Sequence, residues 1–308
     1  MDPEVSVIIP YYRGPKWLPL SLSSVLRQEG VTLEIIVVDD GSEVSPDDII
    51  GGFADRRIRL LRISHGGKGA AVNAGARVAQ ASLICILDQD DEMLPGRLAA
   101  QAAVLRANAG IDGVYSDYER RNENGGLIDI FISRQASRDE MLHCLATTTG
   151  LFSIQTLLMR KRIFDEVGGL FPDDRITGFD DAEFFIQLLV SGGRLRYVPG
   201  VFARWISHSS NYSKSARFHE ARLFWIERLT FLAAEHEILK RELPFFKAHN
   251  YFMRGIFFLG ENNPEKAVPE FVKAIKADWL NVNSYYLLGK SVVWRVVSSL
   301  FKHRCPHK

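Results

Sequence analysis

Short aliphatic runs alternate with helical patterns through the first hundred residues, and this alternation limits the fold more than any other feature. Four runs rich in branched aliphatic residues are typical of buried strands: VSVII (5–9), LEIIVVDD (33–40), IRLLRIS (58–64) and LICILD (83–88). Apolar or small residues at helical spacing lie between or after them, at 18–28, 70–81 and 95–109. Repeated strand and helix segments predict an α/β fold with a doubly wound, mostly parallel central sheet flanked by helices.

The pattern changes along the rest of the chain. Residues 111–207 are less regular, with strands expected in GVYSDYE, SIQTLLM, RLRYVP and FARWIS, and helices in RDEMLHCLA and DAEFFIQLLVSGG. From about Phe218 helical periodicity continues almost to the end, and residues 251–279 have the spacing of one tetratricopeptide-like helical hairpin. We therefore predict a first domain of residues 1–215 and a C-terminal helical domain of residues 216–308.

Composition and charge exclude several classes of protein. The 308 residues carry a formal net charge of +1, so no overall field attracts nucleic acid or an anionic membrane. The cysteines, Cys85, Cys144 and Cys305, have neither metal-site spacing nor the even number of a disulfide framework, which favours a reducing compartment. Residues 1–10 lack a signal-peptide pattern, and no apolar run reaches the roughly 20 residues of a membrane span. We expect a cytoplasmic protein without a nucleic-acid partner; peripheral attachment at the inner face of a membrane stays open.

The fourth predicted strand ends in a cluster of carboxylates. Asp88, Asp90, Asp91 and Glu92 follow one another closely, and their charges repel unless something compensates them. Mg²⁺ and Mn²⁺ take oxygen ligands, and Mg²⁺ usually binds one or two carboxylates and completes its shell with water and phosphate oxygens. A D-x-D-D sequence at a strand end supplies such a partial shell. The alternative is a solvated acidic turn that caps the helix after Pro95.

A second acidic pair, Asp39 and Asp40, ends the second predicted strand. The carboxyl ends of parallel strands meet at one edge of the sheet, where ligands bind in such folds. Both acidic groups are therefore expected at the same edge. There an aspartate can accept a hydrogen bond from a nucleobase imide or a ribose hydroxyl, and Gly41 allows the tight turn that follows. The alternative is an Asp-Gly turn without a ligand.

Two further segments are expected near this edge. IIPYYRG (8–14) ends the first strand with Pro10, Tyr11 and Tyr12, which either form the wall of a base pocket or pack at the edge of the core. HGGKGAAVNAG (65–75) is a glycine-rich turn leading into a helix, which can present backbone N–H groups and Lys68 to a phosphate. This segment has neither the P-loop spacing nor G-x-G-x-x-G after the first strand.

Taken together, these segments resemble the family 2 glycosyltransferases with the GT-A fold. The resemblance rests on VSVIIPYYRG, LEIIVVDDGS, GGKGAAVNAGARVAQASLICILDQDD and GLFPDDRITGFDDAEFFIQLLVSGGRLRYVP, in the family's order over residues 3–213. It implies an enzyme with a Rossmann-like GT-A domain that transfers a sugar, with inversion, from a nucleoside-diphosphate sugar to an acceptor hydroxyl. It also implies a divalent cofactor, Mn²⁺ or Mg²⁺, with a UDP-sugar as the favoured donor. The implied acceptor is a carbohydrate or a lipid-linked glycan, in cell-surface polysaccharide or glycoconjugate synthesis.

The same resemblance assigns roles residue by residue. Contacts with the nucleotide-sugar fall to residues at the predicted sheet edge: Pro10, Tyr11, Tyr12, Asp39, Asp40, Lys68, Asn73, Asp88 and Asp90. The metal ligands are Asp91, as first choice, Asp90 and His208, and the general base is Asp181 in FDDAEFF. The chain departs from the family's usual residues at three positions: Arg13 stands where Asn is usual, Val72 where Arg is common, and Asp180 where Glu is frequent.

Other interpretations remain open from the sequence. Asp181 alone fits an acidic residue in the first turn of a helix, and His208 alone fits a structural histidine. The whole chain also fits a nucleotide-sugar-binding or scaffold protein that kept the fold without catalysis, or, less well, a nucleotidyltransferase. The segment SVVWRVVSSLFKHR (291–304) is apolar with a basic end; we expect it to dock on the first domain, bind a partner or lie at a membrane interface.

Overall fold

The computed structural model describes residues 2–147, 151 and 153–278, so the segment 291–304 lies outside the described residues. The described chain forms two compact units. One contains residues 2–138, 151 and 153–211, and the other contains residues 139–147 and 212–278. The second unit therefore begins at Tyr212 and also takes in most of helix α5 (Arg138–Thr147) from the middle of the chain.

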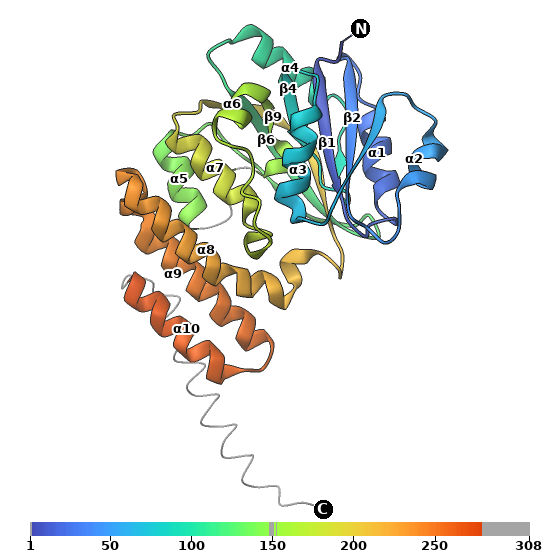
Figure 1. Cartoon of the computed structure of the whole chain (residues 1–308). Helices are drawn as coiled ribbons and strands as arrows, with labels where there is room; N and C mark the ends of the chain where they lie inside the picture. The colour runs from blue at the N-terminus through green and yellow to red at the C-terminus, as the bar shows by residue number, and fades with distance from the viewer. Residues whose placement is uncertain (1, 148–150, 152, 279–308) are drawn as a thin grey trace, which may run out of the picture. The chain divides into compact units, whose positions relative to one another are not determined.

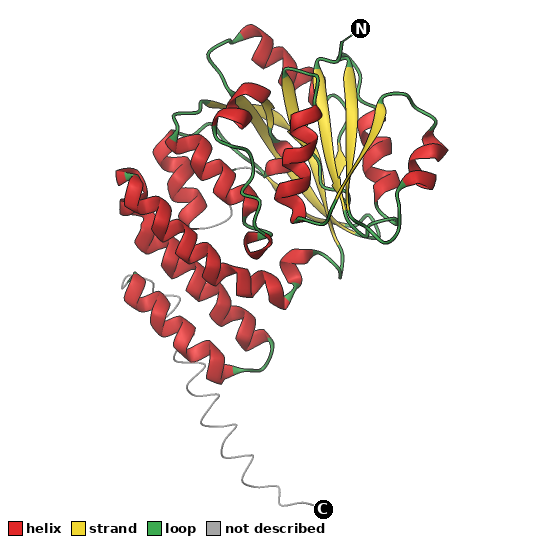
Figure 2. Cartoon of the chain, viewed as in Figure 1, coloured by secondary structure: helices red, strands yellow, loops and turns green. Residues whose placement is uncertain are grey.

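The first unit is a single sheet with helices on both faces (Figure 1 and Figure 2). Its strands are β1 (Val5–Tyr11), β2 (Leu33–Asp40), β3 (Ile58–Ile63), β4 (Leu83–Ile86), β5 (Glu92–Met93), β6 (Gly113–Asn122), β7 (Leu127–Phe131), β8 (Leu158–Arg160) and β9 (Leu195–Ser207). Its helices are α1 (Leu18–Leu26), α2 (Asp47–Phe53), α3 (Gly67–Val78), α4 (Arg97–Ala107), α6 (Lys161–Glu166) and α7 (Asp180–Val190), with 3₁₀ turns η1 (Ile154–Thr156) and η2 (Asp174–Ile176).

The predicted α/β sheet flanked by helices is confirmed, and its pairing is mixed. The described strands have the order β3-β2-β1-β4-β8-β6-β9-β5, with β7 paired to β6. β1 is parallel to both β2 and β4, β2 is parallel to β3, and β6 is parallel to β9. β8 runs antiparallel to β4 and β6, and β5 and β7 run antiparallel to their partners. A short turn joins β6 to β7, and such a turn can join only antiparallel strands.

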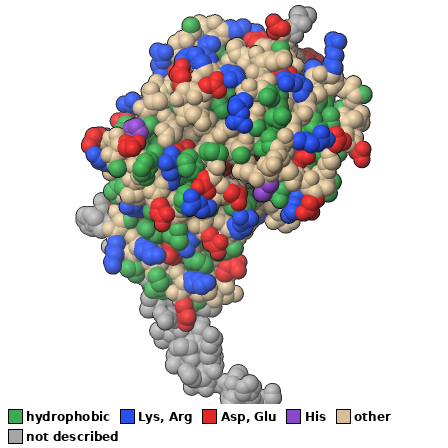
Figure 3. Space-filling model, in the orientation of Figure 1, with side chains coloured by type: hydrophobic (Ala, Val, Ile, Leu, Met, Phe, Trp, Pro, Cys, Tyr) green, Lys and Arg blue, Asp and Glu red, His purple; other side chains and the backbone are tan. Residues whose placement is uncertain are grey.

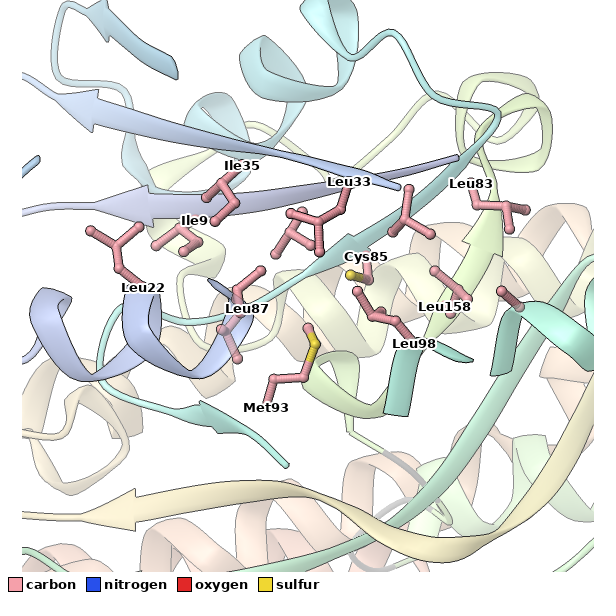
Figure 4. Packing of buried hydrophobic residues seen from close by; sticks show 14 of the residues in the cluster. Ile9, Leu22, Leu33, Ile35, Leu83, Cys85, Leu87, Met93, Leu98 and Leu158 are labelled. Atoms are coloured by element: carbon pink, nitrogen blue, oxygen red, sulfur yellow. The ribbon is translucent and has the colours of Figure 1, made fainter. Parts of the chain in front are cut away.

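The sheet core explains why the aliphatic runs become parallel strands. Alternate residues of β1, including Val7 and Ile9, pack with α1 and α4 on one face, in the apolar cluster of Figure 4. The intervening Ile8 faces α3, where a side chain on Gly75 would come within 2.7 Å of the isoleucine. Because both faces are covered, the strands read as continuous hydrophobic runs rather than alternating ones. This packing fixes the carboxyl ends of β1, β2 and β4 beside one another.

Several elements of the first unit differ from the expectation. RLRYVP and FARWIS form one strand, β9, because β9 passes through Gly200, at φ 136°, while the register with β6 shifts opposite Asp117. In SIQTLLM only the end is a strand, β8, and its start is the turn η1. The short elements α2, α6, β5 and β7 carry too few residues for a clear periodic signal, and the sequence did not indicate them.

The second unit is helical, with η3 (Tyr212–Lys214), α8 (Ala216–Glu235), α9 (Glu237–Gly260) and α10 (Pro264–Ala277) beside α5. The hairpin predicted at 251–279 is formed by α9 and α10, although α9 begins well before the predicted stretch. Gly255 lets the two helices approach closely, since a Cβ there would lie 2.4 Å from the Phe271 ring. Arg254 and Glu270 form a buried ion pair between them, with 3.0 Å between nitrogen and oxygen.

The side of the molecule drawn in Figure 3 carries no strongly charged patch. Figure 3 shows acidic and basic side chains interspersed over the visible side, in keeping with the formal net charge of +1. Such a surface does not build the extended positive potential that nucleic-acid binding needs. None of the helices in the described part of the chain is both long and apolar enough to cross a bilayer.

Candidate active site

The glycine-rich turn after β3 is held by Asp40 at the end of β2. Oδ1 of Asp40 accepts the Gly66 N–H at 2.8 Å, and Oδ2 accepts the Gly67 N–H at 2.9 Å. Nδ1 of His65 also lies 2.9 Å from Oδ2. Gly41 has φ +69°, and a Cβ there would lie 2.9 Å from the backbone nitrogen of His65. The Asp-Gly sequence is therefore needed for the close approach of two turns, and both oxygens of Asp40 are occupied.

The end of β1 lies beside the end of β2, at the same edge of the sheet. Tyr11 is fully buried, and its hydroxyl donates to the Val44 carbonyl at 2.9 Å. Burial and then the charge of Asp39 raise the pKa of Tyr11. Tyr12 is half-buried and stacks on His65, with 4.4 Å between ring centroids. Asp39 itself is buried, and one of its oxygens accepts the Ser42 N–H at 2.9 Å. Tyr12 thus presents a ring at this edge, whereas Tyr11 belongs to the core.

The acidic loop after β4 is tied to β1 through Gln89. Oε1 of Gln89 accepts the Tyr12 N–H, and its Nε2 donates to the Tyr12 carbonyl, each at 3.0 Å. A side chain on Gly14 would collide with Gln89, at 2.4 Å. Between Tyr12 and Gly14, Arg13 has φ +53°, a left-handed conformation in which Asn is favoured over most residues. The family's usual Asn at this position therefore has a backbone explanation.

Lys68 connects three elements of the site. Its Nζ lies 2.7 Å from Oδ1 of Asp88, at the end of β4. Burial alone would lower the pKa of Lys68, but the charges of Asp88, Asp180 and Asp181 together outweigh burial and raise the pKa. The N-terminus of α3, the acidic loop and the first turn of α7 are thus close enough to interact electrostatically. The structure brings together residues that lie more than a hundred positions apart in the sequence.

Two adjacent aspartates begin α7, after Gly178 at φ +87°. Oδ1 of Asp180 accepts the Gly178 N–H at 2.9 Å, while its Oδ2 is buried without a hydrogen-bond partner in the described residues. Burial is the main reason why the pKa of Asp180 is raised. Asp181 is half-buried, and its Oδ1 accepts the Ala182 N–H at 2.8 Å. Burial and then the charge of Asp180 raise the pKa of Asp181 to about 6.

Asp90 pairs with His208, which follows β9. Oδ2 of Asp90 lies 2.9 Å from Nε2 of His208. Asn211 fixes the histidine, because its Oδ1 accepts the His208 N–H at 2.7 Å and its Nδ2 lies 3.0 Å from Nε2. Trp17 stacks on the imidazole, with 4.5 Å between centroids. Burial, followed by the charge of Asp88, raises the pKa of Asp90.

Asp91 is the most deeply buried of these acidic residues, at 1% exposure. Its Oδ1 accepts the Ile206 N–H of β9 at 2.9 Å, and its Oδ2 accepts from Nε2 of Gln155 on η1. Burial and then the charges of Asp90 and Asp88 raise its pKa well above the usual value. Asp91 thus joins the acidic loop to two other segments, and both its oxygens already have partners. Its assignment as first-choice metal ligand stays a prediction.

Asn73 lies on α3 and faces the chain that leads to α7. Its Nδ2 donates to the Leu170 carbonyl at 2.7 Å, and its Oδ1 accepts the Leu170 N–H at 2.9 Å. Both ends of the amide are therefore used to position this connection. Its predicted contact with the donor stays a prediction.

The donor set fits a divalent cation only in part. The described residues contain no group of three or more His, Cys, Asp or Glu side chains arranged to hold a metal ion. Adjacent ligands of an octahedral ion at 2.0–2.1 Å are about 3 Å apart, and Oδ2 of Asp90 and Nε2 of His208 are 2.9 Å apart. Mg²⁺ usually takes few protein ligands and completes its shell with water and phosphate oxygens. In the structure this contact is a hydrogen bond, so Nε2 of His208 would have to lose its hydrogen before both atoms bind a cation.

Sequence reasoning missed five residues of this site: Trp17, His65, Gln89, Gln155 and Asn211. Trp17, His65, Gln89 and Gln155 have partners distant in the sequence, and Asn211 bonds to His208, which itself pairs with the distant Asp90, so periodicity carries no signal for any of them. His65 and Gln89 lay inside segments already singled out, and the position of Gln89 between Asp88 and Asp90 was the one available hint.

Comparison with known proteins agrees with the fold and the segments described above. The family model for glycosyl transferase family 2 matches residues 6–168. The succinoglycan biosynthesis protein ExoO of Rhizobium meliloti is 36% identical over 255 residues, which cover 78% of this chain and 69% of ExoO. The Escherichia coli UDP-Glc:alpha-D-GlcNAc-diphosphoundecaprenol beta-1,3-glucosyltransferase WfgD is 32% identical over 135 residues, 44% of this chain and 53% of WfgD.

Structural similarity extends over the whole chain. A crystal structure of S. aureus TarS residues 1–349 in complex with UDP-GlcNAc matches with a TM-score of 0.67 at 16% identity, covering 99% of this chain and 93% of the TarS chain. The chain spans slightly under half the length, 44% and 46%, of two similar uncharacterized glycosyltransferases from Rickettsia felis and Rickettsia conorii. The resemblance inferred from the sequence is confirmed: the chain belongs to glycosyl transferase family 2 and has the GT-A glycosyltransferase fold.

Proposed function

We propose that this protein transfers a sugar, with inversion, from a nucleoside-diphosphate sugar to an acceptor hydroxyl, with a divalent metal bound at the donor diphosphate. The observation that carries the proposal is the group formed by Lys68, Asp88 and Asp181. These residues come from three separate elements, yet their charges act on one another at the carboxyl edge of the sheet. Ligands of open α/β sheets bind at this edge.

Asp181 is the proposed general base. An acceptor hydroxyl has a high pKa, so its proton must be removed as the new bond forms, and a positioned carboxylate typically contributes about 10²–10⁴-fold. A pKa raised to about 6 keeps Asp181 ionised at neutral pH while making it a stronger base than an ordinary aspartate. A single base supports a single displacement, which inverts the anomeric centre.

Asp90 and His208 are the proposed metal ligands, on the ground of their 2.9 Å separation. The bound cation would neutralise the negative charge that develops on the leaving diphosphate. Asp91 orients the acidic loop through Ile206 and Gln155. Lys68 is the proposed cationic contact for the diphosphate, held in place by Asp88. Tyr12 is the proposed wall of the nucleoside pocket.

The relatives support a choice of donor and acceptor. TarS was crystallised with UDP-GlcNAc, WfgD is named for UDP-Glc and a diphosphoundecaprenol-linked acceptor, and ExoO for succinoglycan biosynthesis. We therefore propose a UDP-sugar donor and a carbohydrate or lipid-linked glycan acceptor, in cell-surface polysaccharide or glycoconjugate synthesis. A lipid-linked acceptor would bring the protein to the inner face of a membrane as a peripheral enzyme.

The test compares catalysis with donor binding. Release of UDP from a panel of UDP-sugars is measured with Mn²⁺ or Mg²⁺ and with EDTA, in the presence of lipid-linked glycan acceptors, and the anomeric configuration of the product is read by NMR. Asp181→Asn should bind UDP as the wild type does but lose transfer. Asp165→Asn, which removes an exposed carboxylate of α6, is the matched control and should keep full activity.

Two outcomes would overturn the proposal. If Asp181→Asn transfers sugar at the wild-type rate, the base has been assigned wrongly. If the wild-type protein binds UDP-sugars with a metal but transfers sugar to none of the acceptors, the non-catalytic nucleotide-sugar-binding alternative replaces catalysis.

A further inference from the structure

Strand β7 has no buried face. Its residues from Leu127 to Ile130 are all exposed, and Phe131 is half-buried. The strand and the residue after it are nevertheless mostly aliphatic, with exposed fractions of 52% for Leu127, 46% for Ile128, 46% for Ile130 and 68% for Ile132. These four make up half of the exposed large hydrophobic side chains in the described part of the chain. Antiparallel strands commonly pack one face on the core, and a contiguous apolar surface marks an interaction site.

The strand is attached to β6 by contacts that do not involve its isoleucines. Phe131 stacks on Tyr118 of β6, with 5.0 Å between ring centroids. Oδ1 of Asp129 accepts a hydrogen bond from Nε of Arg120, also on β6, at 3.1 Å. Because these contacts and the ladder with β6 fix the hairpin, the isoleucine side chains can be exchanged while the contacts that form it are kept.

The hairpin of β6 and β7 extends past the end of β4. Leu158 of β8 pairs with Cys85 of β4 on one side and with Val114 of β6 on the other. β4 ends at Ile86, whereas β6 continues in the same direction to Asn122. β7 pairs with this last part of β6, so it lies on the carboxyl side of the sheet, where the acidic loop begins.

The turn of this hairpin reaches the rim of the proposed site. Oε2 of Glu123 lies 3.0 Å from Nζ of Lys16, in the loop that leads from β1 to α1. The same Nζ lies 4.2 Å from the centroid of the Trp17 ring, and Trp17 stacks on His208, a proposed metal ligand. The exposed aliphatic strand therefore borders the site at which the acceptor has to arrive.

The outer edge of β7 is poorly suited to pairing with another strand. Among the described strands β7 pairs only with β6. Asp129 lies opposite Arg120 and Leu127 lies opposite Arg121, so Ile128 is an extra residue in a β-bulge. Bulges and charged residues are features by which edge strands avoid pairing with another chain. A second copy of this chain, or another extended peptide, is therefore disfavoured as the occupant.

A lipid surface fits the strand better than a protein does. A folded partner would cover one side of β7, whereas fluid acyl chains can surround side chains that point in different directions. At the boundary between headgroups and acyl chains, water is still present and can satisfy the free backbone groups of the edge.

The charges of the hairpin balance one another. Residues 118–134 contain as many acidic as basic residues, namely Glu119, Glu123 and Asp129 against Arg120, Arg121 and Arg134. Attraction to anionic lipid therefore contributes little, and burial of apolar side chains would supply the binding energy.

We infer that β7 inserts into the surface of a lipid bilayer, at the boundary between headgroups and acyl chains, through Leu127, Ile128, Ile130 and Ile132. This inference rests on the proposed function for its lipid-linked acceptor, and it adds the part of the enzyme that meets the lipid. An enzyme held in this way meets its acceptor on a surface rather than in solution. The contact should therefore lower KM for a lipid-linked acceptor and leave kcat unchanged.

Vesicle sedimentation with the full-length protein tests the contact without donor or metal. The wild type should bind vesicles of neutral phosphatidylcholine. Added anionic phosphatidylglycerol, or high salt, should leave the affinity unchanged, because the hairpin has no excess charge. Failure of the wild type to bind these vesicles, or binding that needs the anionic lipid and is lost in salt, would overturn the inference.

Matched variants separate the apolar surface from the fold of the hairpin. Ile130→Ser combined with Ile132→Ser should bind vesicles about a hundredfold more weakly, about tenfold for each aliphatic side chain removed from the lipid. Ile130→Leu combined with Ile132→Leu keeps the apolar surface and should bind as the wild type does. Phe231→Ser, which removes an exposed ring of α8, is the control for loss of any exposed apolar side chain.

Three results with these variants would overturn the inference. The first is a serine variant that binds vesicles as well as the wild type, and the second is an equal loss of affinity in Phe231→Ser. The third is a wild-type dimer, detected by light scattering, that the serine variant loses, since a second copy would then occupy the strand.

Kinetics distinguish this inference from the proposed function. With a glycan acceptor that lacks the lipid, the serine variant should match the wild type, whereas with the lipid-linked acceptor in vesicles its KM should rise by about tenfold or more. If both proteins use the lipid-linked acceptor with the same KM, the membrane contact is wrong and the glycosyltransferase proposal stands. If neither transfers sugar to any acceptor, the proposed function fails, and vesicle binding alone decides the membrane contact.

Discussion

The dipeptide Asp-Asp occurs three times in this site, and two of these pairs, Asp39-Asp40 and Asp180-Asp181, lie in opposite environments. Asp39 and Asp40, at the end of β2, accept hydrogen bonds from nearby backbone N–H groups and from His65. Asp180 and Asp181, at the start of α7, have a buried oxygen without a partner in the described part of the chain and raised pKa values. The first pair stabilises a turn, whereas burial of the ionised second pair lowers the stability of the protein.

This contrast teaches where catalysis is to be sought. A carboxylate that accepts hydrogen bonds from backbone N–H groups of a turn, as Asp40 does, supports the structure of that turn. A carboxylate that the fold buries without full compensation is a better base and destabilises the protein when it ionises. The following predictions test that distinction, from the largest expected effect to the smallest.

The largest effect is expected for loss of the base. Asp181→Asn should lower the turnover number by about 10²–10⁴-fold, because the acceptor proton has no carboxylate to go to. Asp40→Asn should leave the turnover number much less affected, since Asp40 holds a turn. Steady-state kinetics with saturating UDP-sugar measures both. If Asp40→Asn is the more damaging of the two for turnover, the proposed division of roles is reversed.

Stability should respond in the opposite order. Asp40→Ala removes the acceptors of two backbone N–H groups and of His65, and should lower the free energy of unfolding by about 2–4 kcal/mol. Asp48→Asn, an exposed carboxyl in α2, is the control and should change it little. Urea unfolding followed by circular dichroism gives the free energies. A cost below about 0.5 kcal/mol for Asp40→Ala would mean that the turn does not depend on Asp40.

The pH dependence of stability separates two interpretations of Asp181: a buried general base, and an acid that only complements the dipole of α7. Its folded-state pKa, about 6, lies above that of an unfolded aspartate, so the native state binds more protons between about pH 4 and pH 6. The contribution of Asp181 to the free energy of unfolding is therefore favourable at low pH and is lost as the pH rises through 6. Asp181→Asn should stabilise the protein above pH 6, by the order of 1–3 kcal/mol.

The simple helix-terminus interpretation predicts the reverse. An acid in the first turn of α7 that only complements the helix dipole would stabilise the protein, and its removal would cost about 0.3–1 kcal/mol. Thermal unfolding of wild type and Asp181→Asn at pH 5 and pH 8 decides between a stabilising and a destabilising carboxylate.

Lys68 links the second pair to the acidic loop, and its removal should shift the pH profile of the reaction. The charge of Lys68 lowers the pKa of Asp181 against the effect of burial. In Lys68→Met that pKa should rise, moving the acidic limb of the turnover number from about pH 6 to a higher pH by about one unit. Lys240→Met, an exposed lysine paired with Glu237, is the control. An unchanged limb would show that Lys68 and Asp181 do not interact in the working enzyme.

The smallest effect concerns the departure from the family at Arg13. This residue has φ +53°, and its ion pair with Glu43 is solvent-exposed, with side-chain exposures of 55% and 78%. Exposed pairs contribute little, and Asn tolerates the left-handed conformation better than Arg. Arg13→Asn should therefore raise the free energy of unfolding by about 0.5 kcal/mol. A loss of stability larger than that would show that the Arg13 side chain matters more than its backbone.

The sequence was sufficient where the physical cause is local. Continuous aliphatic runs mark β1, β2 and β4 because a strand covered on both faces needs apolar residues throughout. Small residues on α3, such as Gly75, mark a helix that packs close to a sheet. The acidic ends of β2 and β4 could be placed at one edge because parallel strands share their direction. The resemblance to the family then supplied Asp181 as the candidate base and His208 as a candidate metal ligand.

The tertiary structure decided everything that depends on partners distant along the chain. Whether an aspartate is quiet or reactive follows from the donors that reach it: Gly66 and Gly67 reach Asp40, and no donor reaches the buried oxygen of Asp180 within the described residues. The continuity of β9 through Gly200 follows from its ladder with β6. Hydrogen-bond satisfaction and burial are properties of a packed environment, and no run of neighbouring residues specifies them.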